Sequence, residues 1–230
     1  MPLPAQSQCG QVQCDQPKCV ALVLAGGKGL RFDKDLPKQY HTLSSGQSVI
    51  RQSIQAFLDH PAIEGVFAVV HSETESLFYE QTQGLPLLGV TIGGEARQDS
   101  VLNGLELMNS LNPPYVLVHD GARPFVSASI IQRVVDGLAH EKGVIPVVPV
   151  TDTIKRVQNG RVFETLDRSN LVRVQTPQGF EFKTLYELHQ RYKGQNFTDD
   201  AALFEKAGLT VLCVDGCDTN IKITTKKDIV

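Results

Sequence analysis

Short apolar runs alternate with segments of helical spacing along most of this chain, and that alternation limits the folds it can adopt. In the helical segments apolar residues recur three and four positions apart, as at Val49, Ile50, Ile54 and Phe57. Repeated strand–helix units predict an α/β class: a Rossmann-like three-layer α/β/α fold with a mostly parallel twisted sheet. The predicted strands cover 20–24, 65–70, 89–92, 115–118 and 143–150.

The first predicted strand ends in a glycine-rich loop, AGGKG, at 25–29. Glycines at a strand end leave backbone N–H groups open to phosphate oxygens, and Arg31 and Lys38 bring positive charge to the same place. The loop differs from the dinucleotide-binding fingerprint because Phe32 stands where the third glycine belongs. We therefore expect the loop to bind a nucleoside triphosphate.

Two further strand ends carry polar loops. The sequence GGEAR follows the third strand, and DGARP follows the fourth. In open parallel sheets ligands bind beyond the carboxyl ends of the strands, so the three loops are expected to line one site.

The strand–helix alternation breaks between 151 and 182. Asn159-Gly160, between two strand-like runs, predicts a β-hairpin. We interpret about 151–175 as an arm inserted into a nucleotidyltransferase domain at 19–230. A hairpin outside the sheet cannot bury both faces alone, so we expect it to pair with a second copy in a homodimer. Helices are predicted at 185–192 and 199–207, and a last strand at 220–224.

Composition excludes some classes of function. The net charge of −3 argues against a broad basic surface for nucleic acid. No apolar run approaches the roughly 20 residues that a membrane helix needs, so no membrane partner is expected. Residues 1–18 have the composition of a flexible leader rather than a secretion signal, and the five cysteines form no common zinc motif. A reducing, cytoplasmic setting is the default.

Eight sequence blocks, in order, resemble the 2-C-methyl-D-erythritol 4-phosphate cytidylyltransferase family. The resemblance covers about 20–230 and implies a further C-terminal helix beyond it. It also implies a bacterial, cytoplasmic enzyme that transfers CMP from CTP to the phosphate of methylerythritol phosphate and releases pyrophosphate. The blocks are AGGKGLRF, PKQY, GG with Arg97 and Ser100, HDGARP, DTIK, DRSNL, TPQGF and NIKIT.

The resemblance also assigns roles to residues. Arg31 and Lys38 would stabilise the transition state, and Lys28 would cover the outer phosphates. Arg168, reaching across the dimer, and Lys222 would position the attacking phosphate. Cytosine and ribose would be read by a third group: Ala25, Gly26, Gly94, Glu95 and Ser100, with Gly27 in the same loop.

The acceptor and the metal complete the expected site. Asp120 and Arg123 would hold the polyol, with Thr153 nearby. The expected cofactor is Mg²⁺, bound mostly by triphosphate oxygens and water, with Asp120 as the candidate protein ligand.

Plainer interpretations stay open at this stage. The glycines could form only a tight turn, Arg31 and Lys38 could be solvated, and Asp120 and Arg123 could be structural. Two alternative functions also remain: a cytidylyltransferase for another polyol phosphate such as ribitol 5-phosphate, and a nucleotide-binding module without catalysis.

Overall fold

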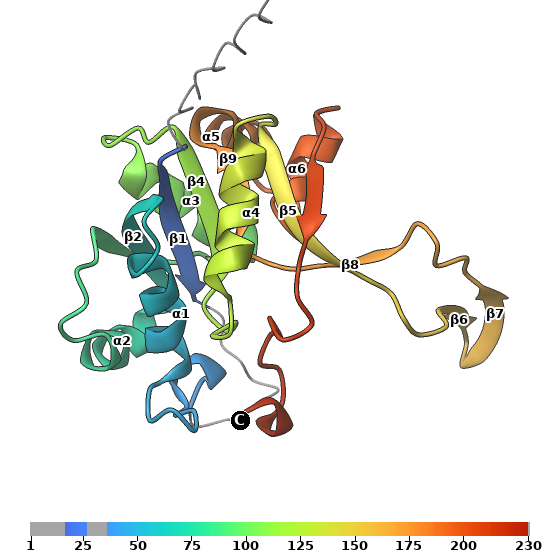
Figure 1. Cartoon of the computed structure of the whole chain (residues 1–230), viewed down its shortest axis with the longest axis horizontal. Coiled ribbons are helices and arrows are strands. Elements are labelled where there is room, and N and C mark those ends of the chain that lie inside the picture. Colours follow the sequence, from blue (N-terminus) through green and yellow to red (C-terminus); the bar gives the residue numbers. More distant parts are fainter. Residues whose placement is uncertain (1–16, 27–35, 230) are drawn as a thin grey trace, which may run out of the picture.

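The computed structural model describes residues 17–26 and 36–229, and its main body is a single sheet between two layers of helices (Figure 1). The order of the main sheet is β10-β5-β9-β4-β1-β2-β3, and β8 pairs with β5. Four neighbouring strands are parallel: β1 (Cys19–Ala25), β2 (Ile63–Val70), β3 (Gly89–Ile92) and β4 (Tyr115–Asp120). The other four are β5 (Gly143–Pro149), β8 (Val172–Val174), β9 (Gln178–Glu181) and β10 (Leu212–Asp215).

Strand β1 shows why the sheet lies between two helical layers. Ala21 and Val23 pack in one buried cluster, whereas Val20 and Leu22 pack in another, because successive side chains of a strand point to opposite faces. A strand that is apolar on both faces has to be covered on both faces. The three-layer prediction is therefore confirmed.

Helices α1 (Val49–Leu58) and α4 (Ala128–Leu138) cover one face, and α3 (Arg97–Met108), α5 (Phe182–Arg191) and α6 (Ala201–Lys206) cover the other (Figure 1). The short helix α2 (Glu75–Gln81) buries Phe78 in the first layer. Single 3₁₀ turns lie at Lys38–Tyr40, Ser72–Thr74 and Lys226–Asp228. None of the helices in the described residues is long and apolar enough to cross a membrane.

Two predictions about the C-terminal third are wrong. The segment Gln178–Glu181, which was expected to belong to the break in the strand–helix pattern, is strand β9, antiparallel between β4 and β5 in the middle of the sheet. Asn220–Thr224 is not a strand. Its Ile223 donates a backbone hydrogen bond to the carbonyl of Ala122 and packs with Leu43 and Val49 instead.

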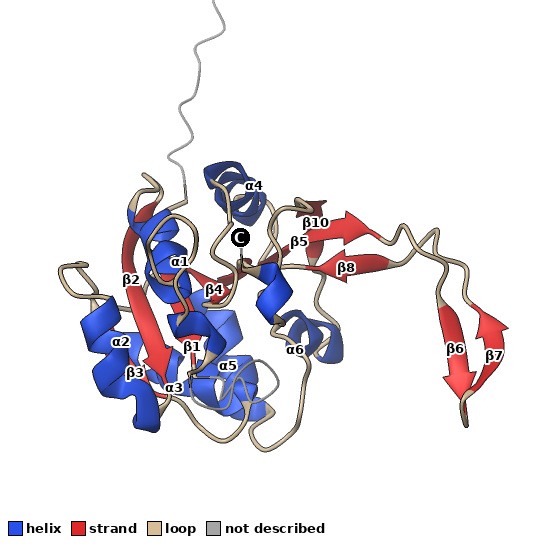
Figure 2. Cartoon of the chain, turned by 90° about the horizontal axis from the view of Figure 1, so that it is seen from below, coloured by secondary structure: helices blue, strands red, loops and turns tan. Residues whose placement is uncertain are grey.

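The arm is present as predicted. β6 (Lys155–Gln158) and β7 (Arg161–Thr165) form a separate antiparallel hairpin that projects from the body (Figure 2). Its turn residues Asn159 and Gly160 have φ of 51° and 74°, the positive values that two-residue hairpin turns need. Both strands are exposed along their whole length. Use of the arm in a dimer stays a prediction.

The root of the arm is tied into the main body. β8 pairs with β5, and Gln175, just after β8, donates a backbone hydrogen bond to the carbonyl of Pro146. The Gln175 amide donates to the carbonyl of Cys217 at 2.7 Å and accepts from the backbone N–H of Cys217 at 3.1 Å. Gln175 thus joins the root of the arm to the segment that leads to Lys222, and Arg173 on β8 joins them again through its ion pair with Asp218.

Candidate active site

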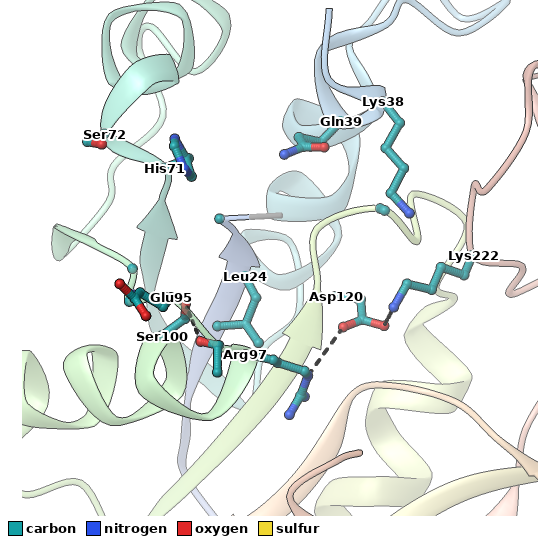
Figure 3. Close-up of a pocket in the computed structure, with 15 residues that line it drawn as sticks. Leu24, Lys38, Gln39, His71, Ser72, Glu95, Arg97, Ser100, Asp120 and Lys222 are labelled. Carbon is teal, nitrogen blue, oxygen red and sulfur yellow. Dashed lines mark hydrogen bonds and ion pairs between the residues drawn. The ribbon is translucent and has the colours of Figure 1, made fainter. Parts of the chain in front are cut away.

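A cavity of about 580 Å³ lies beyond the carboxyl ends of β1, β2 and β4 (Figure 3). This is the edge at which an open parallel sheet binds ligands. The lining is Leu24, Gly26, Lys38, Gln39, His71, Ser72, Gly93, Gly94, Glu95, Ala96, Arg97, Ser100, Asp120, Ala122 and Lys222.

Seven of the predicted site residues line this cavity together: Gly26, Lys38, Gly94, Glu95, Ser100, Asp120 and Lys222. Ala25 lies at its edge, where its carbonyl accepts a 2.7 Å hydrogen bond from the Gln39 amide. Gly27, Lys28 and Arg31, like residues 1–16 of the predicted leader, lie outside the described residues.

Arg168 and Thr153 are exposed residues of the arm, on either side of its hairpin, and do not line the cavity of their own chain. Arg168 donates a hydrogen bond to the carbonyl of Thr151. Because Arg168 is expected to act across a dimer, a single chain leaves its role untested.

The loop after β3 is shaped by its packing on helix α3. A Cβ on Gly93 would lie 2.6 Å from the Ser100 hydroxyl oxygen, and one on Gly94 would lie 2.3 Å from the Cβ of Asp99. Both glycines therefore let the first turn of α3 pack against this loop. There Ser100 accepts a 3.2 Å hydrogen bond from the backbone N–H of Gly94.

Gly26 differs from these two glycines. A Cβ there would meet nothing closer than the Ser100 oxygen at 3.7 Å, so packing within the described residues does not require a glycine. The missing side chain instead leaves space at the cavity wall, which favours close approach by a ligand.

Asp120 is surrounded by cations at the end of β4 (Figure 3). Its carboxylate lies 2.8 Å from Lys222 Nζ, 3.6 Å from Arg123 Nε and 4.0 Å from Arg97 Nε. Burial raises the pKa of Asp120, but Lys222 and Arg97, followed by Arg123, outweigh it and hold the pKa well below its usual range. The carboxylate is therefore ionised at neutral pH, and Arg123 contacts it from behind the cavity wall.

Arg97 belongs to one of the sequence motifs, but sequence reasoning assigned no role to it. Its Nη2 lies 2.8 Å from Oδ2 of Asp200, so one guanidinium lies between Asp200 and Asp120. Asp200 is fully buried and its Oδ1 is 3.0 Å from Nε2 of His189. Burial raises the pKa of Asp200, but Arg97 and His189 lower it to about 2.

His119, the residue before Asp120, is linked to the Asp120 backbone through Thr176. Nε2 of His119 donates to the carbonyl of Arg123 at 3.1 Å, so Nδ1 is left to accept from the Thr176 hydroxyl at 3.1 Å. Thr176 accepts in turn from the backbone N–H of Asp120 at 3.1 Å. Burial lowers the pKa of His119 to about 4, so the ring is neutral at physiological pH.

His71, Ser72 and Gln39 line the opposite wall and were missed from the sequence (Figure 3). Nδ1 of His71 accepts from the backbone N–H of Glu73 at 3.2 Å, which places the proton of the neutral ring on Nε2. For His71 and Ser72 the available signal was their position directly after the predicted strand 65–70, and for Gln39 it was the PKQY block. The cavity thus combines glycine backbone with the cations Lys38, Arg97 and Lys222, which suits a multiply charged anion.

Comparison with known proteins identifies the family. A family model described as 2-C-methyl-D-erythritol 4-phosphate cytidylyltransferase (IspD) matches residues 19–230. The chain belongs to this family. The bifunctional enzyme IspD/IspF of Paramagnetospirillum magneticum is 49% identical over 212 residues, which cover 92% of this chain and 55% of that protein.

Solved structures show the same fold. The 4-diphosphocytidyl-2C-methyl-D-erythritol synthase of Anaerococcus prevotii has a TM-score of 0.80 at 27% identity, covering 93% of both chains. The cytidylyltransferase of Thermus thermophilus has a TM-score of 0.76 at 32% identity, covering 92% of this chain and 95% of that one. The chain spans about half the length of the curated relatives it matches.

The described residues offer no preformed protein site for the expected metal ion. The described part of the chain holds no group of three or more histidine, cysteine or acidic side chains able to bind a metal. The candidate ligand, Asp120, already has Lys222, Arg123 and Arg97 around its carboxylate. The described residues therefore do not favour direct ligation by Asp120.

Proposed function

We propose that this chain transfers CMP from CTP to the phosphate of 2-C-methyl-D-erythritol 4-phosphate. An oxygen of the acceptor phosphate forms a bond to the α-phosphorus, the bond from that phosphorus to the β-phosphate oxygen breaks, and pyrophosphate leaves. The observation that carries the proposal is the cavity at the strand ends, lined by glycine backbone and by cations in a chain of this family.

The chemistry asks mainly for positioning and neutralisation of charge. The acceptor phosphate and the triphosphate are both anions and repel each other. Lys38, at the cavity wall, is suited to the charge that develops on the α-phosphoryl oxygens, and Arg31 and Lys28 are proposed to share this task.

Cytosine recognition is proposed for the walls formed by Ala25, Gly26, Gly94, Glu95 and Ser100. Backbone carbonyls and amides can distinguish the N4 donor and N3 acceptor of cytosine from the edge of uracil. A wrong base would leave buried polar groups without partners, which disfavours its binding.

The acceptor is proposed to bind beside Asp120. The ionised carboxylate can accept hydrogen bonds from polyol hydroxyls, while Lys222, 2.8 Å from it, can reach the acceptor phosphate. Arg123, bonded to the carbonyl of Asn220 at 2.8 Å, fixes the far side of Asp120.

We further propose that the chain is a homodimer joined through the arm, with Arg168 and Thr153 of each copy beside the cavity of the other. The arm supports this because its large apolar side chains are exposed: Val157, Val162 and Phe163 on the hairpin, and Leu171, Val172 and Val174 at its root. An isolated two-stranded hairpin of this kind is marginally stable in water.

Mg²⁺ is proposed to accompany CTP, held by triphosphate oxygens and water rather than by a set of protein ligands. The relatives named above come from bacteria, which supports a bacterial cytoplasm as the place where the reaction occurs.

Release of pyrophosphate tests the proposed reaction. The chain is mixed with Mg²⁺ and CTP, UTP or ATP, and with methylerythritol phosphate or ribitol 5-phosphate as acceptor. We expect release with CTP and methylerythritol phosphate and little with the other pairs. Preference for ribitol 5-phosphate would assign another acceptor, and tight CTP binding without transfer to either acceptor would favour a non-catalytic module.

A further inference from the structure

We propose that Asp200 is a positioning residue for the acceptor site, acting through Arg97. This inference rests on the proposed cytidylyl transfer. Asp200 does not line the cavity, but it holds the guanidinium that flanks Asp120. The contacts that support this role begin at the buried carboxylate of Asp200.

Asp200 is fixed from three sides at the start of α6. Its Oδ1 faces Nε2 of His189 on α5 at 3.0 Å, and its backbone N–H donates to the Gln178 amide oxygen on β9 at 3.2 Å. Its Oδ2 lies 2.8 Å from Nη2 of Arg97. A buried carboxylate needs a compensating charge, and Arg97 supplies it.

Arg97 is thereby held in one direction. It is the first residue of α3, its side chain is only 28% exposed, and its planar fork meets Asp200 through Nη2 while Nε faces Asp120. A guanidinium has a fixed planar shape, so fixing one edge sets the direction of the other. Asp200 therefore decides how closely the positive charge of Arg97 approaches Asp120.

The distances from Asp120 to Lys222 and Arg97 are consistent with this restraint of Arg97 by Asp200. Lys222 lies 2.8 Å from the carboxylate, whereas Arg97, restrained by Asp200, remains at 4.0 Å. Without the charge of Asp200, the guanidinium would turn towards Asp120 and compete with Lys222 for it. The acceptor site would then lose the arrangement of Asp120 and Lys222, while the glycine loops that face the nucleotide would be unaffected.

Steady-state kinetics of Asp200→Asn test the proposal with CTP and methylerythritol phosphate varied in turn. Asn keeps the size of the side chain but removes its charge. We expect kcat/KM for the acceptor to fall by about tenfold to a hundredfold, while the KM for CTP stays near that of the parent. A merely structural role would lower the amount of active protein without separating the two substrates.

Arg97→Lys is the second variant, and it is informative even where Asp200→Asn folds poorly. Lysine keeps the charge but has no fork to span both carboxylates, so the same loss of acceptor kcat/KM is expected. Leu138→Ala, in the core on α4 and away from the cavity, is the control for lowered stability; it should leave both KM values unchanged where it is folded.

A double variant decides whether Asp200 acts through Arg97. The Arg97→Gln/Asp200→Asn pair should be no worse for the acceptor than Arg97→Gln alone, because the second change then has nothing left to misplace. Losses that multiply, or normal acceptor kinetics in Asp200→Asn, would overturn the positioning role alone. A parent chain that transfers no CMP would overturn the proposed function and, with it, this inference.

Discussion

The cavity edge of the sheet and the arm are built in opposite ways within one chain. At the cavity the carboxylate of Asp120, whose side chain is only 14% exposed, faces Lys222, and the buried carboxylate of Asp200 faces Arg97. On the arm both strands are exposed along their whole length, and Phe163 is 66% accessible. The cavity is thus fixed by contacts inside the chain, whereas the hairpin of β6 and β7 is exposed outside the main sheet. This chain therefore has one surface suited to an anion and another suited to a large apolar surface.

Removal of a cation at the cavity should give the largest effect. Lys38→Ala is expected to lower kcat by about 10²–10³, because one fixed positive group opposite the developing charge is lost. Circular dichroism and melting should stay close to those of the parent. Lys183→Ala, exposed on α5, is the matched control and should keep normal turnover; near-normal kcat in Lys38→Ala would remove Lys38 from the mechanism.

A charge on the arm should separate the two copies. Phe163→Glu is expected to convert a dimer into a monomer in light scattering and to reduce activity by about 10²-fold, because Arg168 of the second copy is then misplaced. Leu111→Glu puts the same charge on an exposed leucine of the body and should change neither property. If the parent is already monomeric at micromolar concentration, the proposed use of the arm is wrong.

Acid should lower the free energy of unfolding, because the buried His119 on the cavity side of the body resists protonation. Its pKa is about 4 in the folded chain against an ordinary value of 6.5, so below pH 6.5 the unfolded chain binds a proton that the folded chain refuses. Stability should therefore fall as pH drops from 6.5 to 4, by on the order of 3 kcal/mol.

Urea unfolding at pH 7.5 and pH 5 measures this slope. His119→Gln should flatten it, leaving the smaller contribution of His60, whose pKa is also lowered by burial. The lowered pKa values of Asp120 and Asp200 add little at pH 5, because a depressed carboxylate loses its stabilising effect as pH falls through its ordinary pKa of 3.8. An equal slope in parent and variant would mean that His119 is not the acid-sensitive group.

Substitution of two glycines, Gly121 in the body and Gly160 in the arm, should give the smallest of these effects and should differ between the two regions. A Cβ on Gly121 would lie 2.9 Å from the carbonyl oxygen of Leu24 and 2.8 Å from Cδ1 of Ile50, so Gly121→Ala should cost about 1–3 kcal/mol of global stability. Gly160, at φ 74° in the arm, meets nothing within 4 Å, so Gly160→Ala should cost about 1–2 kcal/mol of local strain. Thermal melting should register the first change and barely the second.

The strands predicted correctly are those with continuous apolar runs, such as Val20 to Leu24. A strand buried on both faces is apolar at successive positions, so its sequence alone indicates it. Strand β9 was missed because Phe180 is its only large apolar residue, and its place is set by its neighbours β4 and β5. Asn220–Thr224 was wrongly taken for a strand because Ile221 and Ile223 alternate with polar residues, while Ile223 is in fact buried beside the loop at Ala122.

Site residues in the loops at strand ends could be predicted from the sequence. Contacts between side chains far apart in the sequence could not. Gly94, Asp120 and Lys222 line one cavity, as expected from their loops and from the family resemblance. The pairing of Arg97 with Asp200 could not be read from the sequence, because nothing local joins residues on α3 and α6. The same holds for Thr176 beneath His119.

Gln175 links the root of the arm to the segment that carries Lys222. One side chain bonds both to Cys217 and to Asn220, two residues before the lysine, while its backbone bonds to β5. Loss of this one side chain would therefore remove hydrogen bonds from the root of the arm and from the segment that places the Lys222 ammonium beside Asp120.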